Sequence, residues 1–279
     1  MKRVDPRVYT KDYYLNDCTG FNEFKISFGK ILELRFAELI KYFDIKANTR
    51  VLDIGCGRGE MVFYAAGKGA EAIGVDYSKD AINLAKLAQK RQQKDIQNKT
   101  EFFFMDAKKL EFRSSSFDLI IMTDVVEHLY PEELELAFKE IKRVLKPKGK
   151  LIIHTAPNKL FNDLFYKFYS YPISSLLIFI WNLFTKEKYP NIAKPSEIRT
   201  ESHAIMHINE PTYFSLSSLY KNYKFEGSLL SSNVTVRKPI FGVKDAIFNF
   251  LVFWDPISRK YPFNILCGSD FISILTNKK

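Results

Sequence analysis

Two hydrophobic periods alternate along residues 50–158. Short apolar runs typical of buried strands occur at residues 50–55, 70–76, 100–106, 117–124 and 149–156. Longer segments with apolar residues at helical spacing separate these runs. Ser78 is placed to cap one such helix, whose apolar face contains Ala81, Leu84, Ala85 and Ala88. Alternating strands and helices predict a parallel sheet with helices on both faces, and such sheets bind ligands at the carboxyl ends of their strands.

Another helix is expected to begin at Pro131, where proline is well tolerated. Its apolar stripe is predicted to contain Leu134, Phe138, Ile141 and Leu145. We expect Lys142, Arg143 and Lys146 in its last turn, where the helix dipole favours cations. Pro147 is expected to end it.

The whole chain, residues 1–279, is interpreted as one domain. Its parts are a helical N-terminal segment at 1–48, a ligand-binding core at 49–158, an apolar helical insertion or lid at 159–205, and a C-terminal part at 206–279 that completes the sheet. The C-terminal part contains a helix within 210–223, strand candidates at 225–232, 233–238 and 270–277, and a second lid segment at 238–262. Residues 168–185 carry no charge but include Pro172 and Asn182, so a buried or interfacial helix is favoured over a membrane span.

Composition and charge bear on the partners and the cellular location that we expect. The formal net charge is +10, yet the basic residues are scattered, and a solvated lysine-rich surface explains them as well as an anionic partner does. No arginine-rich segment is present, and the aromatic residues have apolar neighbours, so nucleic acid is not expected as a partner. Three dispersed cysteines and no visible secretory signal predict a reducing, cytoplasmic location. The oligomeric state is not predicted.

A glycine-rich loop follows the first strand in the sequence VLDIGCGRGE. Gly55, Gly57 and Gly59 suit close approach of the backbone to a ligand. The dinucleotide fingerprint needs glycine at its first, third and sixth positions; with Gly55 as the first, this chain has Glu60 as the sixth, so an NAD-type ligand is disfavoured.

Four features in order complete the pattern: Asp53 with the glycine loop, Asp76 at the end of the second strand, Asp106 at the end of the third, and the sequence FDLIIMTDVVEHL. This pattern resembles the class I S-adenosylmethionine-dependent methyltransferases, in their small-molecule, ubiquinone-pathway-like branch. The resemblance covers residues 49–158 firmly and implies a Rossmann-like, mostly parallel seven-stranded sheet.

The resemblance also implies how S-adenosylmethionine is held. Asp76 would accept the ribose hydroxyls, and Asp53 would lie beside the ammonium group. Asp106 and Ala107 would bind the adenine edge, with Tyr77 against its ring. The backbone of Gly55, Cys56 and Gly57 and that near Thr123 would meet the methionine portion.

The sequence TDVVEHL provides the candidate chemistry, because an alcohol acceptor needs a base or a metal ion to remove its proton. Glu127 and His128 are the candidate acid–base residues. By resemblance to metal-dependent methyltransferases, Asp124, Glu127 and His128 could bind a divalent ion together with His203 or His207. In the alternative, which is favoured, Glu127 caps the Pro131 helix and His128 packs under the cofactor. His154 is interpreted as a satisfied core histidine.

We therefore expect methyl transfer to a small-molecule or lipid-linked acceptor, at oxygen. The two apolar lid segments are expected to cover the acceptor and to touch a membrane surface. A binding or scaffold subunit without activity is the first alternative, and an NAD(P)-dependent reductase is the second.

Overall fold

The computed structural model describes residues 4–186, 188–199, 205–233 and 242–278. Its centre is a seven-stranded sheet in the order β3-β2-β1-β4-β5-β7-β6. The strands are β1 (Arg50–Ile54), β2 (Glu71–Asp76), β3 (Thr100–Phe104), β4 (Phe117–Thr123), β5 (Leu145–Thr155), β6 (Phe225–Ser232) and β7 (Asp270–Asn277). β7 is antiparallel to β5 and β6, whereas the other neighbouring pairs are parallel. The predicted mostly parallel, Rossmann-like sheet is confirmed.

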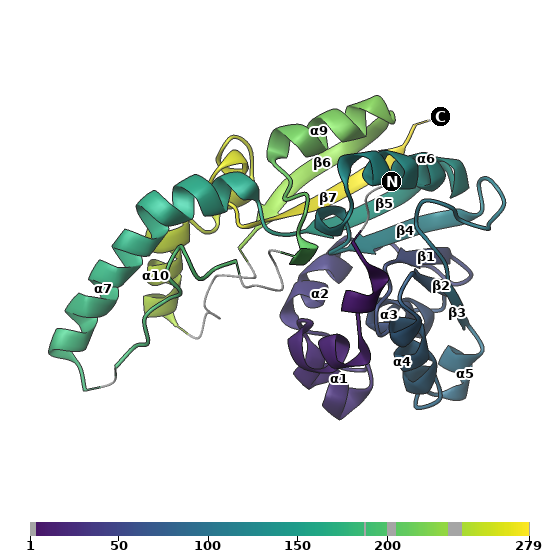
Figure 1. The fold of residues 1–279 in the computed structure, drawn as a ribbon, viewed down its shortest axis with the longest axis horizontal. Helices are drawn as coiled ribbons and strands as arrows, with labels where there is room; N and C mark the ends of the chain where they lie inside the picture. The colour runs from purple at the N-terminus through teal and green to yellow at the C-terminus, as the bar shows by residue number, and fades with distance from the viewer. Residues whose placement is uncertain (1–3, 187, 200–204, 234–241, 279) are drawn as a thin grey trace.

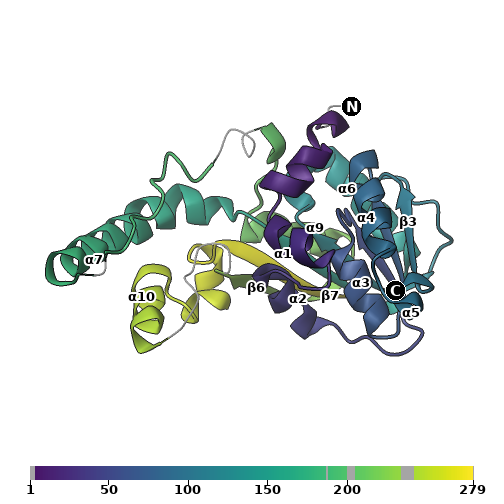
Figure 2. The same ribbon diagram turned by 90° about the horizontal axis from the view of Figure 1, so that it is seen from below.

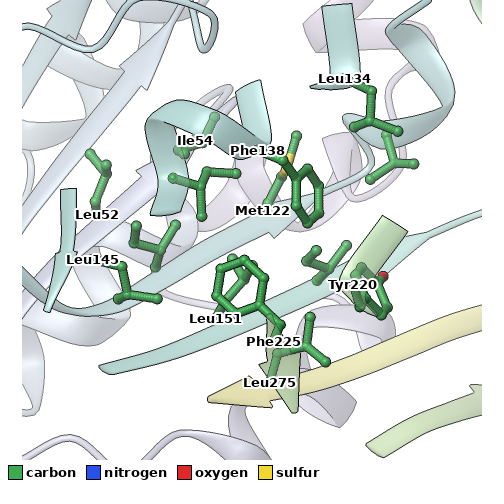
Figure 3. Close-up of a cluster of buried hydrophobic side chains, with 14 of the residues drawn as sticks. Leu52, Ile54, Met122, Leu134, Phe138, Leu145, Leu151, Tyr220, Phe225 and Leu275 are labelled. Carbon is green, nitrogen blue, oxygen red and sulfur yellow. The ribbon is translucent and has the colours of Figure 1, made fainter. Parts of the chain in front are cut away.

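Helices cover both faces of this sheet because its strands are apolar on both sides (Figure 1). On one face, α3 (Glu60–Gly67), α4 (Lys79–Gln89) and the N-terminal segment enclose a core that includes Val51 and Ile121; the short α5 (Lys94–Gln97) precedes β3. On the other face, α6 (Pro131–Val144) packs on β5 and its neighbours, and α9 (Tyr213–Asn222) packs over β6 and β7. Figure 3 shows Phe138 of α6 and Tyr220 of α9 in this second core.

The helix boundaries follow the local sequence with one exception. Ser78 caps α4, since its hydroxyl accepts a hydrogen bond from the Ala81 amide at 3.2 Å. The helix from Pro131 ends at Val144, three residues earlier than Pro147. Leu145, Lys146 and Pro147 belong to β5, because Leu145 is extended and pairs with Phe117 on β4. The predicted helical positions of Leu145 and Lys146 are therefore wrong.

The N-terminal segment consists of short helices at the carboxyl edge of the sheet. These are η1 (Pro6–Val8), η2 (Tyr13–Asp17), α1 (Phe21–Ser27), α2 (Leu34–Leu39) and η3 (Ile40–Tyr42). Phe24, Phe36 and Leu39 anchor the segment in the core against α3. The earlier residues Tyr9 and Tyr14 form a smaller cluster with Ala81 and Leu84 of α4.

The insertion projects from the sheet as an arm, which we define as residues 159–184 together with 242–253. Helix η5 (Phe161–Ser170) runs directly into α7 (Tyr171–Phe184), and α10 (Val243–Phe253) packs against them (Figures 1 and 2). A separate apolar cluster that includes Phe161, Phe165 and Phe253 holds these helices together. The turns η6 (Ile257–Arg259) and η7 (Phe263–Ile265) lead from the arm to β7.

No helix within the described residues is both long enough and apolar enough to cross a membrane. Residues 225–232 and 270–277 form strands with the predicted bounds. Most of the strand candidate at 233–238 lies outside the described residues.

Candidate functional site

A cavity of about 740 Å³ lies at the carboxyl ends of β1, β2 and β4. Its volume is within the range of pockets that enclose small ligands. Every predicted cofactor-binding residue lines it, namely Asp53, Gly55, Cys56, Gly57, Asp76, Tyr77, Asp106, Ala107 and Thr123. Asp124, Glu127, His128 and His207 line the same cavity, whereas His203 lies outside the described residues.

The glycine loop bends sharply where β1 meets the turn after β4. Gly55 has a φ of +73°, and a Cβ atom there would lie 2.3 Å from a methyl group of Val125. Its amide donates to the Val75 carbonyl at 2.8 Å. Glycine is required at this position both for the backbone conformation and for this close contact.

Asp76 fastens the glycine loop to the start of α4. Its two carboxylate oxygens accept hydrogen bonds from the Gly57 amide at 3.0 Å and the Ser78 amide at 2.8 Å. Burial raises the pKa of Asp76 to about 6, against the lowering effect of these amides. Each oxygen keeps a second lone pair, so the carboxylate retains capacity to accept further hydrogen bonds.

Asp53 is buried at the end of β1 with one carboxylate oxygen unsatisfied. Among the described residues, Oδ1 of Asp53 has no hydrogen-bond partner. Burial, followed by the charges of Glu60 and Asp76, raises its pKa well above the usual range. An unsatisfied buried carboxylate is unfavourable, so a donor or cation at this wall of the cavity would stabilise it. This observation fits the ammonium group of S-adenosylmethionine.

The remaining predicted cofactor residues lie around the cavity wall. Asp106 follows β3 by two residues, and its oxygens contact the Lys108 amide at 2.9 Å and the Lys108 ammonium at 3.1 Å. The Tyr77 ring packs on Tyr9, with ring centroids 5.4 Å apart. Cys56 and Thr123 are buried at the ends of β1 and β4.

The Asp124 carboxylate forms ion pairs with two cationic side chains. One carboxylate oxygen is 2.6 Å from Nδ1 of His154, and the other contacts a guanidinium nitrogen of Arg35. Burial alone would raise its pKa, but Arg35 and His154 hold the pKa below the ordinary value. Asp124 therefore lies outside the group of candidate metal ligands, because other charges already satisfy its oxygens.

That group consists of Glu127, His128 and His207, whose ligand atoms lie within 4.8 Å of one another. Two imidazoles with one carboxylate form a donor set suited to a divalent transition metal. The residues fit such an ion in type and proximity.

Glu127 does not cap the helix from Pro131, contrary to the alternative considered above. The Glu133 carboxylate caps that helix by accepting from the Tyr130 amide at 3.1 Å. Glu127 is buried and accepts a hydrogen bond from the Thr155 hydroxyl at 2.8 Å. Burial, followed by the charge of Asp124, raises the pKa of Glu127 to about 8.

The His128 ring is oriented by contacts with the N-terminal segment and with the segment between the two parts of the arm. Its Nδ1 is 2.8 Å from the Tyr9 hydroxyl and 3.1 Å from the Met206 carbonyl. Because a carbonyl only accepts, the contact with Met206 requires the proton on Nδ1, which makes Nε2 the basic nitrogen of the neutral ring. The His207 ring lies edge-on to His128 at 4.8 Å between centroids.

His154 is buried between two carboxylates, as expected for a satisfied core histidine. Its Nδ1 is 2.6 Å from Asp124, and its Nε2 is 3.1 Å from Asp270 of β7. Burial opposes its charge, but the carboxylates dominate and raise its pKa to about 9. His154 is therefore a cation that joins the end of β4 to β7.

Two buried arginines in the cavity wall were not predicted. Arg58 is part of the glycine loop and donates to the backbone carbonyls of Tyr14 and Thr19 at 2.7 and 2.8 Å. Arg35 reaches from α2 to Asp124. The pair Arg58–Glu60 was visible in the loop sequence, but nothing in the local pattern of Arg35 indicates its partner.

A protein-family profile described as a methyltransferase domain matches residues 52–153. The chain is 34% identical over 151 residues to an uncharacterized protein of Methanocaldococcus jannaschii, covering 51% of this chain and 59% of that protein. It is 29% identical over 188 residues to a ubiquinone biosynthesis O-methyltransferase of Pelagibacter ubique, covering 64% and 70%. A phosphoethanolamine N-methyltransferase of Plasmodium falciparum is 31% identical over 134 residues, with 48% of each chain covered. The chain spans about half the length of most curated relatives it matches.

Solved structures show the same fold. A Pyrococcus horikoshii protein superposes with a TM-score of 0.52 and 21% identity over 96% of both chains. A Methanosarcina mazei structure described as an S-adenosylmethionine-dependent methyltransferase gives a TM-score of 0.53 and 22% identity over 88% of this chain and 98% of that one. Residues 52–153 therefore match a methyltransferase domain, and the solved structures share the fold of this chain.

Proposed function

We propose that this protein, whose core is a class I methyltransferase domain, transfers a methyl group from S-adenosylmethionine to the oxygen of a small-molecule or lipid-linked acceptor. The observation that carries the proposal is the shared cavity. Asp53 and Asp76 line one part of it, and Glu127 with His128 lines another. A hydroxyl group must lose its proton when it is methylated, and His128 could accept that proton.

The residues at the ends of the first three strands would hold the cofactor. Asp76 would accept the ribose hydroxyls on its second lone pairs, and Asp53 would neutralise the ammonium group. Asp106 and Ala107 would bind the adenine edge, with Tyr77 against the ring. The backbone of Gly55–Gly57 and Thr123 would meet the methionine portion. The cofactor supplies a methyl group already activated on a sulfonium, so the protein's main tasks are alignment and exclusion of water.

His128 is the proposed proton acceptor. The Met206 carbonyl keeps the proton on Nδ1 and leaves Nε2 basic. The buried carboxyl of Glu127 is mostly protonated near neutral pH, so we assign to it a role in holding the acceptor or passing the proton onward. Tyr9 orients the ring from the N-terminal segment.

A divalent ion is the alternative way to activate the acceptor hydroxyl. Glu127, His128 and His207 would hold it, and its charge would lower the pKa of a bound hydroxyl. Treatment with a chelator distinguishes the two routes. The proton-acceptor route predicts unchanged activity, whereas the metal route predicts activity that is lost and then restored by a divalent ion.

The acceptor side of the cavity supports an apolar acceptor. Tyr166 of η5, Ile192, Ile198 and Phe253 of α10 line this part. The charged residues of this part are paired: Arg199 with Asp163 and Glu210 at 2.8 and 2.5 Å, and Glu197 with Lys194 at 3.5 Å. The relatives include enzymes named for oxygen and for nitrogen acceptors, so our choice of oxygen rests on the proton acceptor in the cavity. The proposal keeps the expected cytoplasmic location, supported by Cys18, Cys56 and Cys267, none of which forms a disulfide among the described residues.

Titration calorimetry with S-adenosylmethionine and with NADH tests the cofactor. We expect binding of the first only, and Asp76→Ala should weaken it about ten- to a hundredfold, because a charged hydrogen-bond acceptor contributes roughly 1.5–3 kcal/mol. Asp95→Ala on the exposed helix α5 is the control and should bind normally. Unchanged affinity in Asp76→Ala would contradict the cofactor assignment.

Product analysis with labelled cofactor and cell extracts then tests the reaction. Label in an ether of the lipid fraction supports the proposal. Cofactor binding without transfer to any extract supports a binding or scaffold subunit instead. Reduction of a substrate by NADPH would favour the reductase alternative.

A further inference from the structure

The arm exposes a continuous apolar row to solvent. Leu164, Phe168, Leu176, Ile180 and Leu183 recur at helical spacing along η5 and α7. Phe168, Phe179 and Leu183 are 68%, 61% and 61% exposed. A helix that only packs as a lid would turn such residues inward, so this surface is unusual for a soluble monomer.

Helix α10 adds a second apolar row to the same body. Val243, Ile247, Phe250 and Leu251 are exposed, whereas Val252 and Phe253 are buried against the arm's own cluster. Figures 1 and 2 both show α7 and α10 side by side, away from the sheet. The two rows therefore belong to one projecting element.

Basic and interfacial side chains border these rows. Lys167 lies over the Phe168 ring at 5.2 Å, and Lys244 lies over Trp181 and Tyr189 at 5.4 and 5.8 Å. Lys186 and Lys188 follow the end of α7 and are exposed. Tryptophan, tyrosine and lysine beside an apolar face are typical of segments that lie in a membrane interface.

The base of the arm is also a wall of the cavity. Asn162 and Tyr166 of η5 and Phe253 of α10 line the cavity, while the rest of η5, α7 and α10 extends from it. One element thus connects the acceptor side of the site to the exposed apolar rows.

We propose that the arm docks on the surface of an anionic lipid bilayer and gives the cavity access to an acceptor dissolved in that bilayer. This inference rests on the proposed function. The positive charge of the arm favours a lipid surface over a second copy of the chain. A second copy would bring its own lysines against those of the first, whereas anionic lipid headgroups attract them. The arm lies on the bilayer and does not span it.

Vesicle co-sedimentation of the full chain tests the proposal, with phosphatidylcholine vesicles and with vesicles that also contain phosphatidylglycerol. We expect binding to the anionic vesicles. The Phe179→Asp, Leu183→Asp variant should lose it. The Lys167→Glu, Lys186→Glu variant should bind about 30-fold or more weakly, because each lysine near such a surface contributes roughly 1 kcal/mol.

Matched control variants alter the same residue types away from the arm. Leu87→Asp, Leu136→Asp changes exposed leucines on α4 and α6, and Lys90→Glu, Lys139→Glu changes exposed lysines near them. Both should bind vesicles like the wild type. Circular dichroism and S-adenosylmethionine calorimetry verify that each variant folds and retains the cofactor site.

Wild-type protein that stays in the supernatant with both vesicle types overturns the proposal. A dimer in sedimentation velocity that Phe179→Asp, Leu183→Asp converts to a monomer, without vesicle binding by the wild type, also overturns it and assigns the surface to a second copy. Both results leave the proposed reaction intact if cofactor affinity is normal, whereas loss of cofactor binding in the wild type contradicts the proposed function itself.

Discussion

The glycine-loop edge of the sheet and the arm are stabilised in opposite ways. At the edge, polar groups are buried and most are paired, as Asp76 is with the Gly57 and Ser78 amides. On the arm, one helix face is buried and the other presents large apolar side chains to solvent. In the first region, contacts within the chain satisfy most polar groups, and the unsatisfied Oδ1 of Asp53 faces the cavity. In the arm, contacts within the chain cover only one face of the helices, and the exposed apolar face is suited to a partner outside the chain.

The largest difference in the free energy of unfolding is expected when the same side chain replaces a glycine in each region. Gly55→Val places a branched residue at a φ of +73° with its Cβ 2.3 Å from Val125. We expect the free energy of unfolding to fall by about 2–6 kcal/mol, from backbone strain and overpacking together. Chemical denaturation measures this change.

Gly242→Val, at the start of α10, is the matched control. Its backbone is extended, with φ of −174°, and a Cβ atom would meet nothing within 4 Å among the described residues. We expect a change of about 0.5 kcal/mol or less. Equal destabilisation by the two substitutions would contradict the contrast between the regions.

A smaller effect is expected from pH, through His154. The pKa of His154 rises from an ordinary value of 6.5 to about 9 on folding, so the folded state binds its proton more tightly. The stabilisation is complete below pH 6.5 and is lost as the pH rises through about 9, a total of about 3 kcal/mol. Denaturation across this pH window should show the loss.

His154→Gln should flatten that pH dependence. It should also destabilise the protein near neutral pH, because Asp124 and Asp270 would lose the cation between them. His207 variants are not a suitable control, since His207 lies in the site. Lys90→Gln, on the surface after α4, is a suitable control and should keep the slope of the wild type. A wild-type stability that is constant from pH 6.5 to 9 would contradict the assignment of charge to His154.

Local chemistry explains why so much of the first region was predictable. The cap at Ser78, the glycine loop and the acid at or near the end of each of the first three strands are properties of short sequence windows. The last strand was also expected from its sequence, and its bounds, Asp270–Asn277, agree with the prediction. Strand ends meet at one edge of a parallel sheet, so these residues had to converge.

The parts that were not predicted depend on contacts distant in sequence. Arg35 reaches Asp124, and His154 links Asp124 to Asp270, across most of the chain. Arg58 binds carbonyls of the N-terminal segment. The early end of α6 has the same origin, because Leu145 leaves the helix to pair with β4. The spacing of residues within one segment does not reveal partners that are distant in sequence.

The smallest effect compares two neighbours on one helix of the arm. Ile178 of α7 is 2% exposed, whereas Phe179 is 61% exposed. Ile178→Val removes one buried methylene and should lower the free energy of unfolding by about 0.5–1.5 kcal/mol. Phe179→Val removes far more apolar area but from the solvent side, so the change should be within about 0.5 kcal/mol. Parallel denaturation curves without lipid measure both. If Phe179→Val is the more destabilising, the exposed row stabilises the folded arm in solution. The contrast between a face buried within the chain and a face available to lipid then disappears.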